Sequence, residues 1–365
     1  MPDAGIPGFA IWLVMTALAL GIIYAAIANR IHPGFLIPLA VGMILVNMPA
    51  PGLKAEYAPF VDALQYLWSH GIYPPLVLLC LGAGLDLSYL IAHPRQLVVG
   101  LLAPFGFMAV MLLGWLIDLP GMEAGIGSLA AGGDGGVSAI FLCGRFAQDL
   151  VGPVGLTAAL LAGLLPVLLP PLAQIFTTRQ ERMIRMPPTR KVAKRENLLF
   201  AAAGLVLTSL LVPAAMMLTG MLFLGNLLKE SGVVERLART FTNRLGDILV
   251  ALLGLAVGAR CQAANILSLT FLKVIFLGLV TVVLVSLLSI MAIKVANLFC
   301  TQKINPLVGP AVLGLPPHAA QLVQVEGRRE DPHNTLFPHA LASSQAGLLA
   351  ATLTAGILWS ILGVG

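Results

Sequence analysis

The sequence predicts an all-α membrane protein that crosses the bilayer several times and consists of two repeated halves, as many transporters do. Of its 365 residues, 58% are hydrophobic and only 10% are charged, whereas a soluble domain is about a quarter charged. The apolar runs are continuous and about 20 residues long, which suits helical spans, and they lack the alternation of membrane β-strands. The net charge of +5 requires no nucleic-acid partner, because membrane proteins collect Lys and Arg in cytoplasmic loops.

Residues 1–70 form the first expected region, with two spans and an interfacial segment. The spans are predicted over residues 8–29 and 34–48. The N-terminal stretch lacks a basic region and a small-residue cleavage site, so we interpret the first apolar run as a span and not as a signal peptide. A polar stretch follows at 49–70, and its mixed apolar and polar end suits a short helix at the membrane surface.

Residues 71–177 are expected to form the first repeat. One span begins near residue 72 and is interrupted around Asp86, and a second span covers 95–118. A third span, over 150–177, contains several prolines. Prolines are tolerated inside a span only where neighbouring helices satisfy the carbonyl groups that they free.

Residues 129–141 interrupt this first repeat with four glycines and one carboxylate, Asp134. Each glycine weakens a helix by about 1 kcal/mol relative to alanine, and an ionisable group within an apolar span normally marks an ion site or pathway. The stretch therefore predicts a broken helix whose backbone, near Gly133 and Gly135, and carboxylate line an ion or substrate site. The alternative is a glycine-rich turn with Asp134 at the level of the lipid head groups.

Residues 178–196 form a linker in which seven Lys and Arg residues outnumber two Glu residues. The positive-inside rule places such a loop in the cytoplasm. We therefore expect a multi-pass protein of a bacterial-type cytoplasmic (inner) membrane, with this linker on the cytoplasmic side and between the two halves.

The second half begins with a connecting region, 197–246, in which two spans across 197–229 precede an amphipathic piece. The second repeat, 247–365, follows. Its expected spans cover 247–259, 270–299 and 336–363. A second broken segment, rich in proline and glycine, is expected at 304–327.

A fixed offset relates the two halves. Leu81 to Gly84 aligns with Leu255 to Gly258, and 258 − 84 = 174. The same offset carries Asp134 to position 308, inside the second break. Interrupted segments at corresponding positions of two halves indicate a transporter binding site, and we expect the halves to be inverted. The alternative is a chance likeness between small-residue patterns.

The second break offers neutral oxygen ligands. Asn305 precedes a proline, which disfavours the helical conformation there, and the carbonyl groups freed near Gly309 could join its side-chain oxygen. Hard cations prefer oxygen ligands, so we expect an Na⁺ site that combines Asp134 with Asn305 and Gly309. Alternatively, Asn305 caps the following helix, with Pro306 in its first turn, and the two roles can coexist.

Five further polar residues are candidates for an accessory role at this site. Asp86 could be a second ligand or a carboxylate at a helix end. His339 and Ser344 belong to a polar group at membrane depth that could face the site or form interhelical hydrogen bonds. The full set is Asp86, Ser138, Gln321, His339 and Ser344.

Several stretches of the chain resemble one family, the membrane-embedded β subunit of sodium-pumping biotin-dependent decarboxylases, whose members act on oxaloacetate, methylmalonyl-CoA or glutaconyl-CoA. The resemblance covers nearly the whole chain. Its clearest stretches are GIYPPLVLLCLGAGLDLSYLIAHPRQLVVG (71–100), LPPLAQIFTTRQERMIRM (169–186), LGNLLKESGVVERLARTFTNRLGDILVALLGLAVGAR (224–260), KINPLVG (303–309) and PHALASSQAG (338–347).

The resemblance implies the membrane subunit of a translocase that decarboxylates carboxybiotin and extrudes Na⁺. It implies Na⁺ as the ion and biotin as a cofactor carried by a partner, with none attached to this chain. The implied partners are a carboxyltransferase α subunit with a biotin carrier, a small γ subunit, the lipid bilayer and further copies of this chain. Asp134 is the implied catalytic residue.

The family motifs carry over unevenly. The family's G-G-A-D-G-P-T-A-I corresponds to GGDGGVSAI here, which keeps the aspartate as Asp134 but shifts it by one position. Asn305 and Gly309 match the family's N-P-L-I-G.

Other family residues are replaced. The family's serine falls at Gly314, its arginine at Gln321 and its final asparagine at Ser344, and its tyrosine is missing near Ala159. Losing the arginine removes a clamp for a carboxylate. The alternatives are therefore a stand-alone secondary transporter of a small organic acid on the same scaffold, or a divergent homologue that does not pump.

Overall fold

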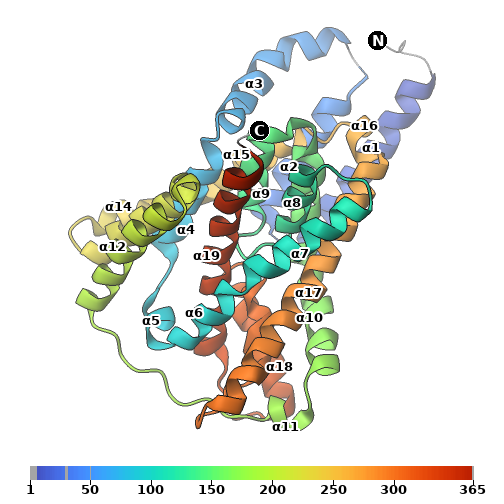
Figure 1. Cartoon of the computed structure of the whole chain (residues 1–365). Helices are drawn as coiled ribbons and strands as arrows, with labels where there is room; N and C mark the ends of the chain where they lie inside the picture. The colour runs from blue at the N-terminus through green and yellow to red at the C-terminus, as the bar shows by residue number, and fades with distance from the viewer. Residues whose placement is uncertain (1–5, 29–31, 50, 364–365) are drawn as a thin grey trace.

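The computed structural model describes residues 6–28, 32–49 and 51–363 (Figure 1). Every regular element in these ranges is a helix, which confirms the all-α prediction. Residue 29 of the first expected span and residue 50 of the polar stretch lie outside the described residues, as do residues 1–5 and 364–365.

The first half of the chain contains helices α1 to α10. Pro33, Pro51 and Pro94 each begin a helix, because the fixed φ of proline suits the first turn and its missing N–H costs nothing there. The bounds are α1 (Ile6–Ala28), α2 (Pro33–Asn47), α3 (Pro51–Ser69), α4 (Tyr73–Gly84), α5 (Ser88–Ala92), α6 (Pro94–Leu101), α7 (Ala103–Leu116), α8 (Gly121–Leu129), α9 (Val137–Phe146), the short turn η1 (Gln148–Leu150) and α10 (Val151–Phe176).

The rest of the chain begins with the linker and contains two long helices, of 31 and 26 residues. Its elements are α11 (Arg179–Arg182), α12 (Lys194–Leu211), η2 (Pro213–Ala215), the π-helical turn η3 (Met216–Gly220), α13 (Met221–Ser231), α14 (Glu235–Arg239), the π-helical turn η4 (Thr240–Leu245), α15 (Gly246–Gly258), α16 (Ala263–Ile266), α17 (Leu269–Phe299), η5 (Pro306–Val312), α18 (His318–Glu330) and α19 (Phe337–Leu362).

Six helical segments of the described chain are long and apolar enough to cross a membrane, so the prediction of a multi-pass membrane protein is confirmed. Large apolar side chains are exposed on them, as at positions that face lipid. The segments are Phe9–Ala28, Pro94–Leu116, Gln148–Phe176, Glu235–Gly258, Leu269–Phe299 and Phe337–Leu362.

Several expected segments differ from the prediction. The spans expected at 34–48 and from residue 72 are α2 and α4, which are 15 and 12 residues long and are not among the six. Residues 49–70 were expected to be mainly polar chain with a short helix at the end, yet the 19-residue helix α3 occupies almost all of them. The two spans expected across 197–229 are α12 and α13, and neither is among the six. The first turn of α12 carries three charges (Lys194, Arg195 and Glu196), and α13 is only 11 residues long.

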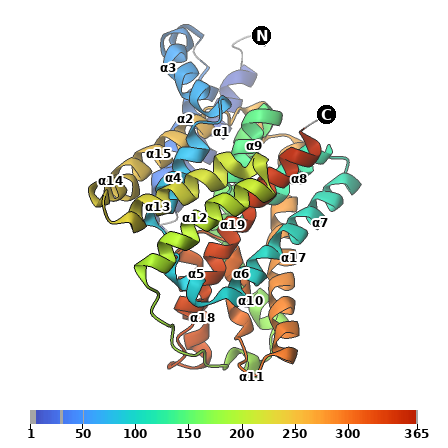
Figure 2. The ribbon, with the colours of Figure 1, turned by 60° about the vertical axis from the view of Figure 1, so that its left-hand side comes forward.

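Two helix pairs join the halves at close crossings: α2 packs against α15, and α4 packs against α13. A Cβ atom on Gly258 would overlap the backbone carbonyl of Leu39, and one on Gly82 would overlap that of Leu222. Only glycine therefore permits either crossing, as is common between helices in membranes. The last helix, α19, is the most deeply buried of the six candidate spans and contacts α6, η5 and α18 (Figure 2).

Candidate ion-binding site

A seven-residue loop, residues 130–136, separates α8 from α9. Gly135 and Gly136 have φ angles of 71° and 81°, which residues with a Cβ atom rarely adopt. The paired glycines therefore turn the chain within a short distance, so that α9 begins beside the end of α8.

Asp134 lies in this loop and is fully buried. One carboxylate oxygen accepts a hydrogen bond from the Gly136 N–H at 3.1 Å, and the other accepts one from the Ser138 N–H at 2.7 Å. Asp134 thus caps the N-terminus of α9, where free N–H groups and the helix dipole favour negative charge. Each oxygen keeps a further lone pair, so the capped carboxylate can still bind a cation.

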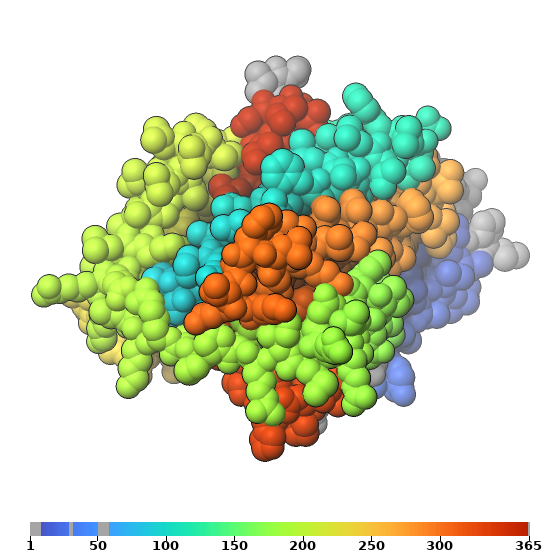
Figure 3. Space-filling model, turned by 60° about the horizontal axis from the view of Figure 1, so that its bottom comes forward, coloured from blue at the N-terminus to red at the C-terminus, as the bar shows by residue number. Residues whose placement is uncertain are grey.

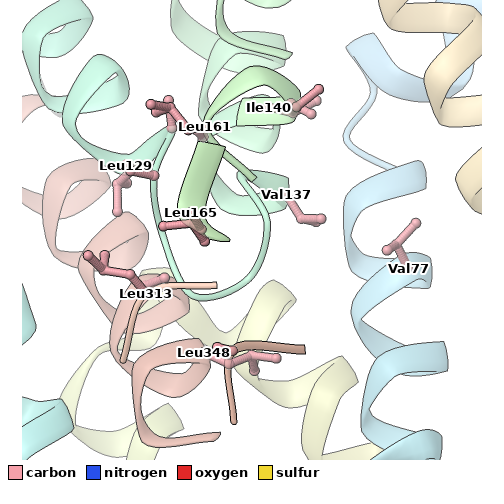
Figure 4. Close-up of a cluster of buried hydrophobic side chains, with 14 of the residues drawn as sticks. Val77, Leu129, Val137, Ile140, Leu161, Leu165, Leu313 and Leu348 are labelled. Atoms are coloured by element: carbon pink, nitrogen blue, oxygen red, sulfur yellow. The ribbon is translucent and has the colours of Figure 1, made fainter. Parts of the chain in front are cut away.

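The carboxylate lines a cavity of about 180 Å³. Apart from Asp134, the only ionisable side chain among the described residues of its wall is His32. The sequence analysis did not single out His32, although its place between two apolar runs, beside Pro33, was an available signal. The other lining residues are glycine or apolar, as Figure 4 shows for Val77, Val137 and Ile140. An acidic group in such a wall is what a monovalent cation needs as a counter-charge.

The loop touches η5 backbone to backbone. A Cβ atom on Gly133 would lie 2.6 Å from the carbonyl oxygen of Val312, at the end of η5, and a Cβ atom on Gly347 of α19 would overlap the same oxygen. The Ser344 hydroxyl donates to the carbonyl of Gly314 at 3.1 Å. The loop and the chain from η5 to Gly314 therefore meet against α19.

Asn305 is also fully buried, but its amide is occupied elsewhere. Its side-chain oxygen accepts from the Leu307 N–H at 3.0 Å, which caps η5. Its NH₂ group donates to the carbonyl groups of Arg182 and Ile184, at 2.7 and 2.9 Å. Gly309 packs on the backbone of α17 at Ser289. Neither Asn305 nor Gly309 lines the cavity at Asp134.

The remaining candidates are spread over the molecule. Asp86 is exposed and accepts from the backbone N–H and hydroxyl of Ser88, so it caps α5. Gln321 is exposed on α18. The Ser138 hydroxyl is buried beside Asp134 and belongs to the residue whose N–H binds the Asp134 carboxylate. In the described ranges, no cluster of three or more His, Cys, Asp and Glu could hold a metal ion.

The basic linker packs against the C-terminal end of α18. The sequence analysis did not predict this contact. Arg182 pairs with Glu330 at 2.8 Å, and Arg185 makes a two-point contact with Asp331 at 2.6 and 3.2 Å. The hydrogen bond and charge of Arg185 lower the pKa of the Asp331 carboxyl group below its ordinary value. Asn334 donates to the same two carbonyl groups as Asn305. Partners more than 100 residues apart leave no local signal in a sequence.

Replacing Asn305 with Ala should loosen the linker. Two hydrogen bonds to linker carbonyls would be lost, and at about 1 kcal/mol each the open form should become roughly 30-fold more populated. Limited trypsin digestion of detergent-solubilised protein would show this as faster cleavage between residues 178 and 196. Gln321→Ala, an exposed change on the neighbouring α18, should digest like the wild type. Equal rates for Asn305→Ala and wild type would show that the amide does not retain the linker.

Comparison with known proteins gives one consistent result. The family described as "Na+-transporting oxaloacetate decarboxylase beta subunit" matches residues 12–362. Among the relatives, the methylmalonyl-CoA decarboxylase subunit beta of Propionigenium modestum is 34% identical, over 96% of this chain and 95% of its own. The glutaconyl-CoA decarboxylase subunit beta of Acidaminococcus fermentans is 32% identical, over 99% and 96%. The oxaloacetate decarboxylase beta chain of Klebsiella pneumoniae is 31% identical, over 94% of each.

Proposed function

The chain belongs to the family of Na⁺-transporting oxaloacetate decarboxylase β subunits, and we propose on this basis that it is the membrane subunit that couples carboxybiotin decarboxylation to outward Na⁺ transport. The observation that carries the proposal is the extent of the match, which runs from residue 12 to residue 362 and includes both broken segments. The six apolar helical segments agree with a transport role.

We propose that Na⁺ binds at Asp134. The buried carboxylate supplies the charge, and the hydroxyl oxygen of Ser138, with carbonyl groups near Gly133 and Gly135, supplies the neutral oxygens that a hard cation prefers. Asn305 and Gly309 would join this site only in a conformation that frees the Asn305 amide from the linker.

Polar neighbours of the two broken segments complete the proposal. Ser344 holds the chain at Gly314 and would support the second segment. Asp86 and Gln345 are joined, since the Gln345 side chain donates to the Asp86 carbonyl at 2.7 Å, and both line a cavity of about 370 Å³ that could give solvent access to the ion. Gln321 stands where the resemblance places an arginine, and it offers a substrate carboxylate a neutral donor only.

We further infer that the two halves are inverted repeats. Each of the two glycine crossings pairs one helix of the first half with one of the second, and in both an asparagine binds the backbone beyond the partner helix. Asn47 of α2 donates to the Cys261 carbonyl after α15, at 2.8 Å. Asn226 of α13 donates to the Leu85 carbonyl after α4, at 3.0 Å. Two such equivalent pairings are what a two-fold axis between inverted halves would produce.

The proposed setting is a bacterial cytoplasmic membrane with the linker, 178–196, on the cytoplasmic side. There the linker and the neighbouring loops would meet a carboxyltransferase α subunit and its biotin carrier. We propose a small γ subunit and further copies of this chain as the remaining partners, with biotin carried by the partner only.

The test is ²²Na⁺ uptake by inverted vesicles that contain the purified protein and its co-purifying partners, with candidate acids supplied. The expected result is uptake that depends on decarboxylation and is blocked by avidin, which sequesters biotin. Uptake of an organic acid without any biotinylated protein would instead identify a stand-alone transporter. Decarboxylation without Na⁺ movement would show that ion coupling has been lost.

A further inference from the structure

A separate cavity of about 390 Å³ lies beside the start of α19, where three other segments meet: the start of α6, the linker and the chain after α17. In Figure 3 these segments adjoin on the face that carries the linker. Three cationic residues line the cavity, Arg95, Arg190 and Lys303, together with His93 and His339. Among the described residues, none that lines the cavity is acidic.

The positive charge of this cavity is only partly compensated. Arg190 pairs with Glu196 at 2.9 Å, on the outside of the linker. Arg95 donates to the backbone carbonyl of Gln302 at 3.3 Å, which leaves its charge unpaired. Within the part of the chain that the structure describes, Lys303 forms no ion pair. Two positive charges therefore remain beside the cavity for an anion.

The floor of the cavity presents an unused polar atom. His339 is 2% exposed, and its Nε2 lies 3.0 Å from the Pro187 carbonyl, so Nε2 carries the hydrogen. Its Nδ1 is buried without a partner, which is costly unless a ligand or a proton satisfies it. The His93 ring lies 3.9 Å away. Burial, with His339 and Arg190 nearby, lowers the pKa of His93 to about 4, so this ring adds no charge at neutral pH.

Exposed apolar side chains lie a few positions along the chain from residues that line the cavity. Val98 on α6 is 61% exposed, and Leu298 and Phe299 at the end of α17 are 80% and 84% exposed. Both helices belong to candidate membrane spans, and the cationic residues lie just at their ends. Cationic groups above an apolar surface match a molecule with an anionic head and apolar chains, and basic pockets at the ends of membrane helices commonly bind such head groups.

We propose that this cavity binds the head group of an anionic phospholipid of the surrounding leaflet: Arg95 and Lys303 hold the phosphate, and the unprotonated Nδ1 of His339 accepts a hydrogen bond from a head-group hydroxyl. Since Pro187 and Arg190 belong to the linker, the bound head group also fixes the linker against α6. The inference goes beyond the proposed function, because neither decarboxylation nor Na⁺ enters it.

The experiment measures bound lipid by native mass spectrometry of the full-length protein, after reconstitution with phosphatidylcholine alone or with phosphatidylglycerol added. The wild type should retain phosphatidylglycerol in preference to phosphatidylcholine. The double variant Arg95→Gln/Lys303→Gln should retain about tenfold less. Arg236→Gln/Arg244→Gln removes the same charge on α14 and η4, outside the cavity, and should bind as the wild type does.

A second arm distinguishes the source of the phosphate. Thermal unfolding in neutral detergent is followed with and without inorganic phosphate. Protection by phosphatidylglycerol but not by inorganic phosphate supports a lipid head group, and protection by both supports a phosphate site open to soluble ligands. Equal retention of the two lipids by the wild type, without protection by phosphate, would overturn the proposal. So would equal losses in the two double variants.

Discussion

Asp134→Asn is expected to reduce avidin-sensitive ²²Na⁺ uptake by inverted vesicles about 100-fold, because a charge-assisted contact to the ion, worth up to about 3 kcal/mol, is lost. The fold should survive. The Asn oxygen can still accept an N–H bond from Gly136 or Ser138, and Asn is as good an N-cap as Asp. What disappears is the negative charge that Asp134 gives to the wall of the cavity.

The matched control is Asp62→Asn, which removes an exposed carboxylate on α3 and should leave uptake unchanged. Decarboxylation should be measured in the same vesicles. If Asp134→Asn decarboxylates but moves no Na⁺, Asp134 serves the ion alone. Full uptake by this variant would remove Asp134 from the ion path and would favour a chain that has kept only the fold.

Gly347→Ala is expected to destabilise the protein by about 3 kcal/mol or to prevent its accumulation, at the upper end of the cost of overpacking a well-packed interior. The added Cβ atom would overlap the Val312 carbonyl oxygen, which is backbone and has little freedom to move. Because Gly133 meets the same oxygen, the loop that carries Asp134 would be displaced as well. Thermal unfolding of the purified protein in detergent measures the first effect.

Gly21→Ala is the matched control for that measurement. Gly21 is a helical glycine of α1, and a Cβ atom added there would have no neighbouring atom within 4 Å. Both variants gain the same intrinsic helix propensity, about 1 kcal/mol. The difference between their unfolding temperatures therefore measures the cost of the added Cβ atom at the contact between α19 and Val312. If the two variants unfold at the same temperature, the contact between α19 and η5 is looser than these distances imply.

Much of the architecture follows from composition. Long apolar runs require helices, because backbone groups within a membrane must be satisfied inside the segment, and the six candidate spans correspond to such runs. The prediction was less accurate at 197–229, where charges at the start of α12 and the shortness of α13 argue against two full spans. Apolar composition alone does not distinguish a helix that crosses the bilayer from one buried among neighbours.

Asn305 shows where local reasoning stops. The sequence predicts a cap from the following proline, and the structure has that cap at Leu307. The sequence does not indicate that the Asn305 amide also donates hydrogen bonds to the carbonyl groups of Arg182 and Ile184, more than 120 positions away in the chain. The part of Asn305 in ion binding stays a prediction.

The sequence by itself determined the membrane class, the helical content and the turn at Asp134, because hydropathy and glycine act through the residues nearest in the chain. Only the tertiary structure decided that Gly133, Val312 and Gly347 meet, that the linker is held by Asn305 and Asn334, and which side chains share a cavity. These contacts depend on which helices become neighbours. Apolar faces are too alike to specify that choice without the close backbone approaches that three-dimensional packing selects.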